Sequence, residues 1–374
     1  MASRRILIIG NYLADNQQSM FRFAHLLVSF YQPYAETSLI SPPVIIGSLG
    51  FVPPGIRKYL AYVDKLLIFP IWLCLIARRY DLVHIADHGN AYYSFCCPSS
   101  QTLITCHDLL AVRTVLGDVS TACTASPIGF LLQRLILAGL RRAGSLVFVS
   151  QATFRDFQRI IKCSPSRRYT VIHNSFNASF TSDVSCLELA ADEKSSIPPS
   201  PFLLMVGSSH PRKNRRMALL LLLELGPQSP YRIVFAGAPC SPDDLLFIAH
   251  HDLSNKVTVI HQPSHSLLNA LYCLSHALLF PSYAEGFGWP LIEAQSSGCP
   301  VIASTMTSIP EVAGDAALYA DPDDISAFAH HVRSLEDQVI RQSNIDKGFL
   351  NITKYDPGLI AQAYARFAFG STSH

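Results

Sequence analysis

The sequence predicts an α/β protein of two domains, each with a parallel β-sheet covered by helices on both faces. The chain has 374 residues, about the length of two domains. Short apolar runs alternate with helical patterns along the chain, as expected for parallel sheets buried on both faces. A buried strand followed by glycine and a helical pattern occurs once in each half, starting near residues 5 and 202.

In the first half, residues 6–9 form the first strand, which ends at Gly10. The further strands predicted here are 82–85, 102–105, 146–149 and 170–172. Helices are predicted at 128–142 and 151–161, and Ser150 is the expected N-cap of the second one.

In the second half, residues 202–206 form a strand that ends at Gly207. The further strands predicted here are 231–236, 257–260, 277–280 and 300–303. Helices are predicted at 217–225, 266–275 and 356–369, the last after a helical and loop region that begins at 325.

These elements predict two Rossmann-like domains, residues 1–180 and 201–355, whose sheets face an interdomain cleft. Residues 181–200 contain Ser, Asp and Glu followed by IPPSP, which is typical of a linker. Residues 356–374 are predicted to form a C-terminal helix and tail. One arrangement expected for this helix is that it packs back on the N-terminal domain.

Composition and charge restrict the class of protein. Hydrophobic residues make up 49% and charged residues 15%, against about 25% charged in an average domain, which excludes disorder and coiled coils. The net charge is +2, but residues 1–180 carry +9 and the rest −7. This asymmetry indicates either an acidic membrane surface as partner or two domains that attract each other. The sequence contains no run of Lys and Arg interleaved with aromatics, the pattern that would indicate nucleic-acid binding.

Ten scattered cysteines without C-x-x-C or Cys/His spacing predict free thiols in a reducing cytoplasm and no metal site. The apolar run 6–9 is too short for a signal peptide. The longest apolar run, 66–77, is flanked by Lys65, Arg78 and Arg79 and is too short to span a bilayer. It is either a buried helix or an interfacial helix, which would place the protein peripherally on the inner face of the membrane.

The segment PSYAEGFGWPLIEAQSSGCPVIAS, residues 281–304, contains the densest motif. Gly286 and Gly288 allow the backbone to approach a ligand closely. Pro290 suits the first turn of a helix. The loop amides and the start of this helix therefore predict a binding site for phosphate.

Two carboxylates flank this predicted phosphate site. Glu285 lies just before the loop and Glu293 is expected in the first helical turn. Carboxylates are poor phosphate ligands but good acceptors for sugar hydroxyls. The alternative is a capped helix with two exposed acids.

The motif resembles the donor-site signature of retaining two-Rossmann-domain (GT-B) glycosyltransferases of group 1, family 4. Their pattern E-G-F-G-x-P-x-x-E is complete at 285–293. The further stretches that resemble this family are 301–324, 206–214, 261–272, 105–109 and 149–157.

The resemblance implies a donor site for a nucleoside diphosphate sugar. Glu293 would bind the ribose hydroxyls, and Glu285 the hydroxyls of the transferred sugar. The amides of Phe287 and Gly288 would contact the sugar or its diphosphate. The other glycines implied at this site are Gly207 and Gly286.

The resemblance also implies catalytic roles for Arg212 and Lys213, which would neutralise the departing diphosphate. This is physically reasonable, because preorganised cations stabilise charge that develops on a leaving group. The alternative is a solvated helix start, with Arg215 and Arg216 nearby.

On the N-terminal, acceptor-side domain, the family places the histidine of TCHDL, His107, beside the transferred sugar. His84, Asp87 and His88 lie at the end of the preceding strand and are candidates for the acceptor pocket. The first loop departs from the family pattern, because Asn11 stands where many members have a second glycine. Polar side chains such as Gln17, Gln18 and Ser19 are expected to replace glycine amides there.

The resemblance therefore implies a retaining, metal-independent hexosyltransferase of polysaccharide biosynthesis. It would move a mannose- or glucose-type sugar from a nucleoside diphosphate sugar to a hydroxyl of a glycan or lipid-linked acceptor. No cofactor is expected. The alternatives are a GT-B sugar-nucleotide epimerase and a non-catalytic sugar-nucleotide-binding protein.

Overall fold

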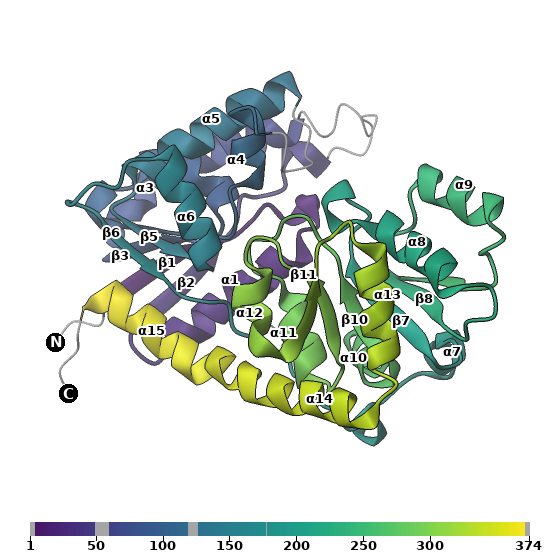
Figure 1. Cartoon of the computed structure of the whole chain (residues 1–374). Coiled ribbons are helices and arrows are strands. Elements are labelled where there is room, and N and C mark those ends of the chain that lie inside the picture. Colours follow the sequence, from purple (N-terminus) through teal and green to yellow (C-terminus); the bar gives the residue numbers. More distant parts are fainter. Residues whose placement is uncertain (1–3, 49–59, 119–125, 177, 371–374) are drawn as a thin grey trace. The chain divides into compact units, whose positions relative to one another are not determined.

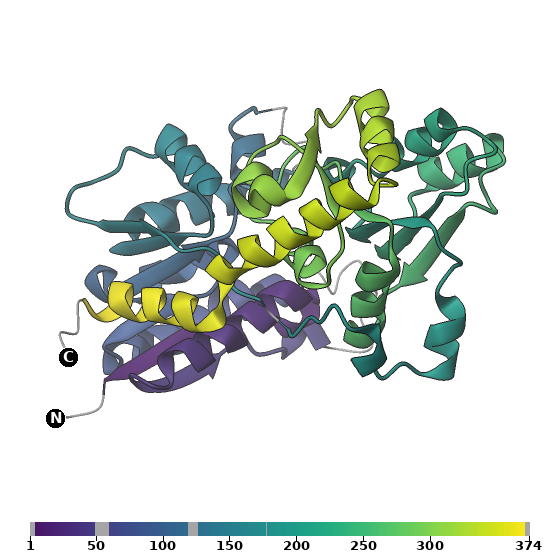
Figure 2. The ribbon, with the colours of Figure 1, turned by 60° about the horizontal axis from the view of Figure 1, so that its bottom comes forward.

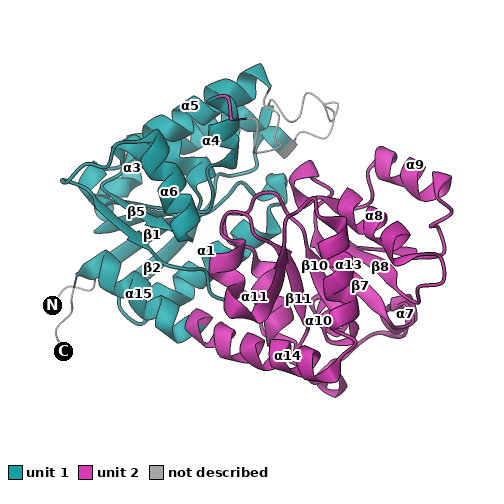
Figure 3. Ribbon diagram, in the orientation of Figure 1, with its two compact units in different colours: residues 1–116, 125–177, 356–374 teal, residues 117–124, 178–355 magenta. Residues whose placement is uncertain are grey.

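The computed structural model describes residues 4–48, 60–118, 126–176 and 178–370, which form two compact units (Figures 1 and 3). Unit 1 comprises Met1–Leu116, Ala125–Asn177 and Asp356–His374. Unit 2 comprises Gly117–Thr124 and Ala178–Tyr355. Each unit contains one six-stranded sheet in which all neighbouring strands are parallel. The predicted α/β fold class is confirmed.

The sheet of unit 1 has the strand order β2-β1-β3-β4-β5-β6. Its strands are β1 (Arg5–Ile9), β2 (Glu36–Ile40), β3 (Leu82–Ile85), β4 (Thr102–Cys106), β5 (Ser145–Phe148) and β6 (Arg168–Val171). Strand β2 was not predicted, because it lies at the sheet edge and its residues ETSLI are only half buried. Its polar residues therefore leave no continuous apolar run in the sequence.

Helices cover both faces of this sheet. They are α1 (Gln18–Tyr31), α3 (Phe69–Ile76), α4 (Leu110–Val115), α5 (Pro127–Arg142), α6 (Gln151–Ile160) and α15 (Pro357–Phe369). Helices α1 and α15 lie side by side, drawn purple and yellow in Figure 2, and the rings of Phe30 and Tyr364 stack at 5.9 Å. The N-cap prediction at α6 is confirmed, since Ser150 Oγ accepts from the Thr153 amide at 3.1 Å.

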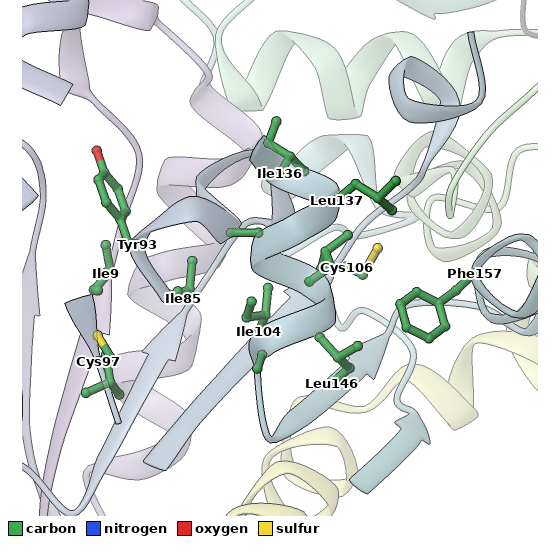
Figure 4. Close-up of a cluster of buried hydrophobic side chains, with 14 of the residues drawn as sticks. Ile9, Ile85, Tyr93, Cys97, Ile104, Cys106, Ile136, Leu137, Leu146 and Phe157 are labelled. Atoms are coloured by element: carbon green, nitrogen blue, oxygen red, sulfur yellow. The ribbon is translucent and has the colours of Figure 1, made fainter. Parts of the chain in front are cut away.

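The face of the sheet opposite α1 and α15 is buried by α3, α5, α6 and the 3-10 helix η5 (His88–Cys96). Their apolar side chains and those of the central strands form one core (Figure 4). Ile9, Ile85 and Ile104 line it from three neighbouring strands, and Leu137 covers them from α5. This core fixes the strand ends from which the polar loops of unit 1 emerge.

The sheet of unit 2 has the strand order β12-β11-β10-β7-β8-β9. Its strands are β7 (Phe202–Gly207), β8 (Arg232–Gly237), β9 (Val257–His261), β10 (Ala277–Phe280), β11 (Val301–Ser304) and β12 (Ala317–Ala320). Its helices are α7 (Ala191–Ser196), α8 (Arg215–Leu225), α9 (Pro242–His250), α10 (His265–Leu274), α11 (Trp289–Ser296), α12 (Ile309–Ala313), α13 (Ile325–Ser334) and α14 (Gln338–Ile352). The edge strand β12 was not predicted.

The segment 181–200, expected to be a linker, groups with unit 2. It contains α7, and the Thr181 amide donates to Asn269 Oδ1 of α10 at 3.0 Å. The chain leaves unit 1 after Asn177 and returns to it at Asp356.

Within the described ranges, one helix, Leu60–Arg79, has the length and apolar composition to cross a membrane. It includes α3 and the predicted apolar run 66–77. Its Asp64 is fully buried and accepts hydrogen bonds from the amides of Ile45, Ile46 and Gly47. One side of this helix is therefore anchored in unit 1.

Candidate functional site

Three loops of unit 2 meet at the carboxyl ends of β7, β10 and β11, where open parallel sheets bind ligands. The Tyr283 amide donates to the Arg212 carbonyl at 2.8 Å. Ser304 Oγ donates to the Ser282 carbonyl at 2.6 Å. These bonds join the loop after β10, which carries the glycine motif, to the loops after β7 and β11.

Glu285 is at the centre of this loop cluster and is only 7% exposed. Its carboxylate lies 2.6 Å from Arg212 Nη1 and 2.6 Å from Lys213 Nζ. Burial alone would raise the pKa of Glu285, but the two cations outweigh it and hold that pKa below its usual value of 4.5. The structure therefore brings together three predicted residues as a buried ionised cluster.

The Lys213 ammonium is held against apolar and backbone surroundings. Burial lowers the pKa of Lys213, and the charge of Glu285 opposes that shift. The ammonium lies 5.0 Å from the centre of the Phe280 ring. Gly207 has a φ of +123°, and a side chain there would begin 3.6 Å from Lys213 Cε. Gly207 thus lies beside the cation for which the donor role was predicted.

Arg212, Lys213 and Arg215 do not all have the same partner. Arg212 and Lys213 precede α8 in a short 3-10 helix and pair with Glu285. Arg215 is buried and donates to the carbonyls of Gly207 and Ala238, both at strand ends. The predicted alternative of a solvated helix start is wrong for Arg212, Lys213 and Arg215, because their charged groups contact protein atoms.

Gly288 begins α11 with a φ of +102°, in the left-handed region that favours glycine. Pro290 lies in the first turn, as predicted. Ser308 Oγ donates to the carbonyls of Glu285 and Phe287 and so fixes the loop from the other side. The Phe287 ring is buried against Tyr355 at 5.6 Å, which leaves the backbone as the part of Phe287 suited to a ligand.

Glu293 lies in the second turn of α11, which corrects the prediction of the first turn, because the helix begins only at Trp289. It is 7% exposed, so the alternative of two exposed acids is wrong. Tyr272 Oη of α10 donates to Glu293 Oε2 at 2.8 Å. Burial and the Glu293 charge raise the pKa of Tyr272 well above its usual value, so the phenol stays a donor.

Sequence reasoning assigned no role to three further residues of the cluster. They are Tyr272, Thr307 and Ser308. The Glu285 amide donates to Thr307 Oγ1 at 2.9 Å. Thr307 and Ser308 lie in the stretch 301–324 that resembles the family, shortly after a predicted strand. Hydroxyl side chains at that position were the signal from which both could have been predicted as site residues.

In unit 1, His107 follows β4 at the carboxyl edge of the sheet and is buried. Its Nε2 lies 3.0 Å from the Ala86 carbonyl, and because a carbonyl only accepts, Nε2 carries the proton. Burial lowers the pKa of His107, against the nearby charge of Asp87. The ring is therefore neutral at pH 7, and it packs edge-on against Phe23 at 4.6 Å.

Asp87 and His88 form a second buried polar cluster beside His107. Asp87 Oδ1 lies 3.1 Å from His88 Nδ1, and Asp87 Oδ2 accepts from Asn11 Nδ2 at 2.7 Å. Burial alone would lower the pKa of His88, but Asp87 outweighs it and raises that pKa above 6.5. Asn11, where a second glycine was expected, thus fixes the carboxylate partner of His88.

The prediction that His84 lines an acceptor pocket is wrong. His84 is fully buried, and its ring lies 3.0 Å from Tyr31 Oη and 2.9 Å from Thr105 Oγ1. Burial lowers the pKa of His84 to about 3. Alternate residues of a strand face opposite sides of the sheet. Val83 and Ile85 of β3 face the core under α5, so His84 faces the other side, where it contacts Tyr31 of α1 and Tyr364 of α15.

The first loop of unit 1 borders a pocket of about 110 Å³. Its lining consists of Asn11, Tyr12, Leu13, Asn16, Gln17, Gln18 and Phe21. Four of these side chains are neutral carboxamides, and Phe21 and Leu13 are exposed. Carboxamides and an exposed aromatic ring are suited to a neutral polyhydroxylated ligand.

Among the residues that the structure describes, no group of three His, Cys, Asp or Glu side chains is placed to hold a metal ion. The loop cluster of unit 2 instead brings Arg212 and Lys213 together with Glu285, and Glu293 follows in α11. Such a set can neutralise an anion and accept hydrogen bonds from hydroxyls in one place.

Comparison with known proteins shows what this chain is similar to. Residues 190–348 match the family model for glycosyl transferases group 1. The matched residues lie in unit 2 and make up less than half of the chain. The two parallel six-stranded sheets and the solved structures that share them show that the chain has the GT-B fold.

Particular relatives are similar over parts of the chain. The O-antigen chain mannosyltransferase B of Escherichia coli is 33% identical over 159 residues, 41% of this chain and 42% of that protein. The chain spans less than half the length of such curated relatives.

Two solved structures share the fold over nearly the whole chain. Sucrose-phosphate synthase from Thermosynechococcus elongatus has a TM-score of 0.72 at 17% identity, covering 97% of this chain and 98% of that one. Anabaena HepE in complex with UDP-glucose has a TM-score of 0.64 at 16% identity, covering 97% and 98%.

Proposed function

We propose that the protein is a retaining, metal-independent hexosyltransferase of the family 4 type. It transfers a mannose- or glucose-type sugar from a nucleoside diphosphate sugar to a hydroxyl of a glycan or lipid-linked acceptor. The observation that carries the proposal is the buried cluster of Glu285, Arg212 and Lys213 beside the start of α11.

Two cations packed on one carboxylate have the chemistry of a diphosphate site. As the bond from the sugar carbon to the diphosphate oxygen breaks, negative charge develops on that oxygen. Arg212 and Lys213 stabilise this charge without reorganising, because Glu285 already holds them in place. The acceptor hydroxyl attacks from the same face, and its proton passes to the departing diphosphate, so the anomeric configuration is retained.

Glu293 is assigned to the ribose hydroxyls and Glu285 to the transferred sugar. An ionised carboxylate accepts two hydroxyl hydrogen bonds well, and Tyr272 orients Glu293 for this. On unit 1, His107 is assigned to the transferred sugar and the carboxamide pocket of the first loop to the acceptor.

The choice of sugar is supported by the names of the relatives. The curated relatives include mannosyltransferases of Escherichia coli and Salmonella typhimurium, and HepE was solved with UDP-glucose. The enzyme would work in the cytoplasm, peripheral to the inner face of the membrane, where lipid-linked acceptors are located. The free thiols of the nine described cysteines are compatible with this compartment.

A donor screen tests the proposal. Thermal unfolding is measured with GDP-mannose, UDP-glucose and other sugar nucleotides, each also in excess chelator. A true donor at about 100 times its Kd stabilises the protein by about 2.7 kcal/mol, with or without chelator. NMR of the product then gives its anomeric configuration. Loss of activity in chelator or an inverted product would overturn the mechanism, and donor conversion without an acceptor would favour the epimerase.

A further inference from the structure

The helix Leu60–Arg79 presents two opposite faces to its surroundings. Phe69, Leu73 and Ala77, spaced by four residues, are fully buried in the core of unit 1. Leu67, Ile71 and Leu75 have the same spacing on the other face and are 58%, 68% and 69% exposed. Trp72 adjoins this row and is 44% exposed.

Helix α5 has the same division. Its Ile136, Leu137 and Leu140 are buried, whereas Ile128, Leu131 and Leu135 are exposed. Between α3 and α5 in the chain lies η5, whose Phe95 is 51% exposed. Eight of the exposed large apolar side chains of these helices form what we call the apolar face: Leu67, Ile71, Trp72, Leu75, Phe95, Ile128, Leu131 and Leu135.

Topology places α3, η5 and α5 on one side of the sheet. The connections β2 to β3, β3 to β4 and β4 to β5 all advance in the same direction across it. Right-handed crossovers therefore put all three connecting elements on one face, and they share a single core (Figures 1 and 4). Their exposed sides consequently point away from the same side of the sheet.

Positive charge surrounds the apolar face. Arg78 and Arg79 are exposed at the end of the first helix, and Arg134 and Arg141 are exposed on α5. The sequences of α3, η5 and α5 contain no Asp or Glu. An apolar face with a basic border and no acidic side chains is complementary to an anionic lipid surface.

We propose that the apolar face docks unit 1 on an anionic bilayer, with the helix Leu60–Arg79 and α5 lying in the membrane interface. The helix does not cross the bilayer, because Asp64 is tied to three backbone amides and Phe69 and Leu73 belong to the core. A second copy of the chain would bring arginines against arginines, whereas lipid phosphates neutralise them. The inference rests on the proposed function for its lipid-linked acceptor, but its test does not depend on sugar transfer.

Vesicle co-sedimentation of the full chain measures docking directly. Vesicles of phosphatidylcholine with about 30% phosphatidylglycerol should bind the protein, and pure phosphatidylcholine should bind it at least about tenfold more weakly. Raising the salt from about 0.1 M to about 0.5 M should weaken binding to the anionic vesicles, because exposed charges are screened.

A matched pair of variants locates the docking surface. Ile71→Glu with Leu75→Glu should weaken vesicle binding at least about tenfold, since two inserted apolar side chains are lost. Leu245→Glu with Leu246→Glu is the control, because these leucines of α9 are 54% and 70% exposed on unit 2. Quenching of Trp72 by brominated lipid gives a second readout, and Trp72→Phe should abolish that quenching.

Several outcomes would overturn the inference. They are absence of vesicle binding, binding insensitive to salt, equal binding by both double variants, or a dimer in light scattering that only the Ile71/Leu75 variant dissociates. Sugar transfer to a soluble acceptor is measured in parallel. Transfer without vesicle binding would remove this inference alone, and vesicle binding without sugar-nucleotide turnover would remove only the proposed function.

Discussion

Lys213 combines burial with a positive charge, which requires a nearby anion. In the described structure that anion is Glu285, and a bound diphosphate would add a second one. The ammonium and the guanidinium of Arg212 would therefore be preorganised for the proposed donor. This arrangement explains two adjacent cations before a helix that already has a positive N-terminal dipole.

Lys213→Met is expected to reduce transfer at least about 10²-fold, because it removes one preorganised cation from the leaving group. The variant keeps most of the side-chain stem and should fold. Arg216→Met is the matched control, since Arg216 pairs with Asp244 at 3.2 Å and not with Glu285. Steady-state transfer rates are measured for both variants. Equal losses of rate in the two would contradict the role assigned to Lys213 at the leaving diphosphate.

His88 carries the clearest pH prediction. Its pKa is raised above 6.5 because Asp87 outweighs the effect of burial. A raised pKa means that the charged pair stabilises the fold fully below about pH 6.5, and this contribution disappears as the pH rises through the raised pKa. His107, Asp108 and Asn11 surround the pair.

NMR titration measures this pKa directly, with His88→Gln used to assign the signal. The midpoint should lie above 6.5 in the wild type and fall in Asp87→Asn. A wild-type midpoint at or below 6.5, or one that Asp87→Asn leaves unchanged, would show that Asp87 does not control the ring.

At the scale of elements, the start of α11 depends on a single backbone conformation. Gly288→Ala places a Cβ at a φ of +102° and 3.0 Å from Leu291 Cδ1. We expect a loss of about 1–2 kcal/mol in the free energy of unfolding from the left-handed backbone and the contact. The donor loop should shift as well and weaken sugar-nucleotide binding.

Gly226→Ala is the control that separates the cost of a left-handed backbone from the effect on the donor loop. Gly226 has a φ of +92° at the end of α8, and a Cβ there would meet nothing within 4 Å. It should lose stability by a similar amount while keeping donor affinity. Thermal unfolding and donor titration of both variants test this, and equal donor affinities would exclude a special role for the α11 start.

The elements also show what the sequence could and could not predict. Ten strands appeared as apolar or β-branched runs, and two of these, β6 and β9, are edge strands. Edge strand β2 did not, because its half-buried residues ETSLI include polar side chains. Edge strand β12 was also missed, although its four residues ALYA form a short apolar run. The motif 285–293 predicted Glu285, Gly288 and Glu293 as site residues, but not the contact of Glu293 with Tyr272. That hydrogen bond links residues of α10 and α11 and depends on tertiary packing.

At the scale of the whole molecule, the two compact units do not follow one another along the chain, because unit 1 contains residues from both ends of the sequence. Helix α15 follows all of unit 2 in the sequence but packs on α1 of unit 1. Its Tyr364 is fully buried among Phe23, Phe30 and Tyr31. The stability of unit 1 therefore depends on a segment that begins at Asp356, 179 positions after Asn177.

Tyr364→Ala should lower the free energy of unfolding of unit 1 by about 3–5 kcal/mol, because it leaves a cavity among aromatic rings. Gln362→Ala on the exposed side of α15 is the control and should change stability little. Thermal unfolding followed by tyrosine and tryptophan signals compares them. If both variants unfold like the wild type, α15 does not stabilise unit 1.

The central claim is that unit 2 holds a sugar nucleotide between the loops after β7 and β10. The most direct measurement is a crystal structure with the donor found in the screen. We predict ribose hydroxyls donating to Glu293 and diphosphate oxygens within hydrogen-bonding distance of Arg212 and Lys213. A sugar nucleotide bound elsewhere, with Glu293 still contacting only protein, would contradict the account.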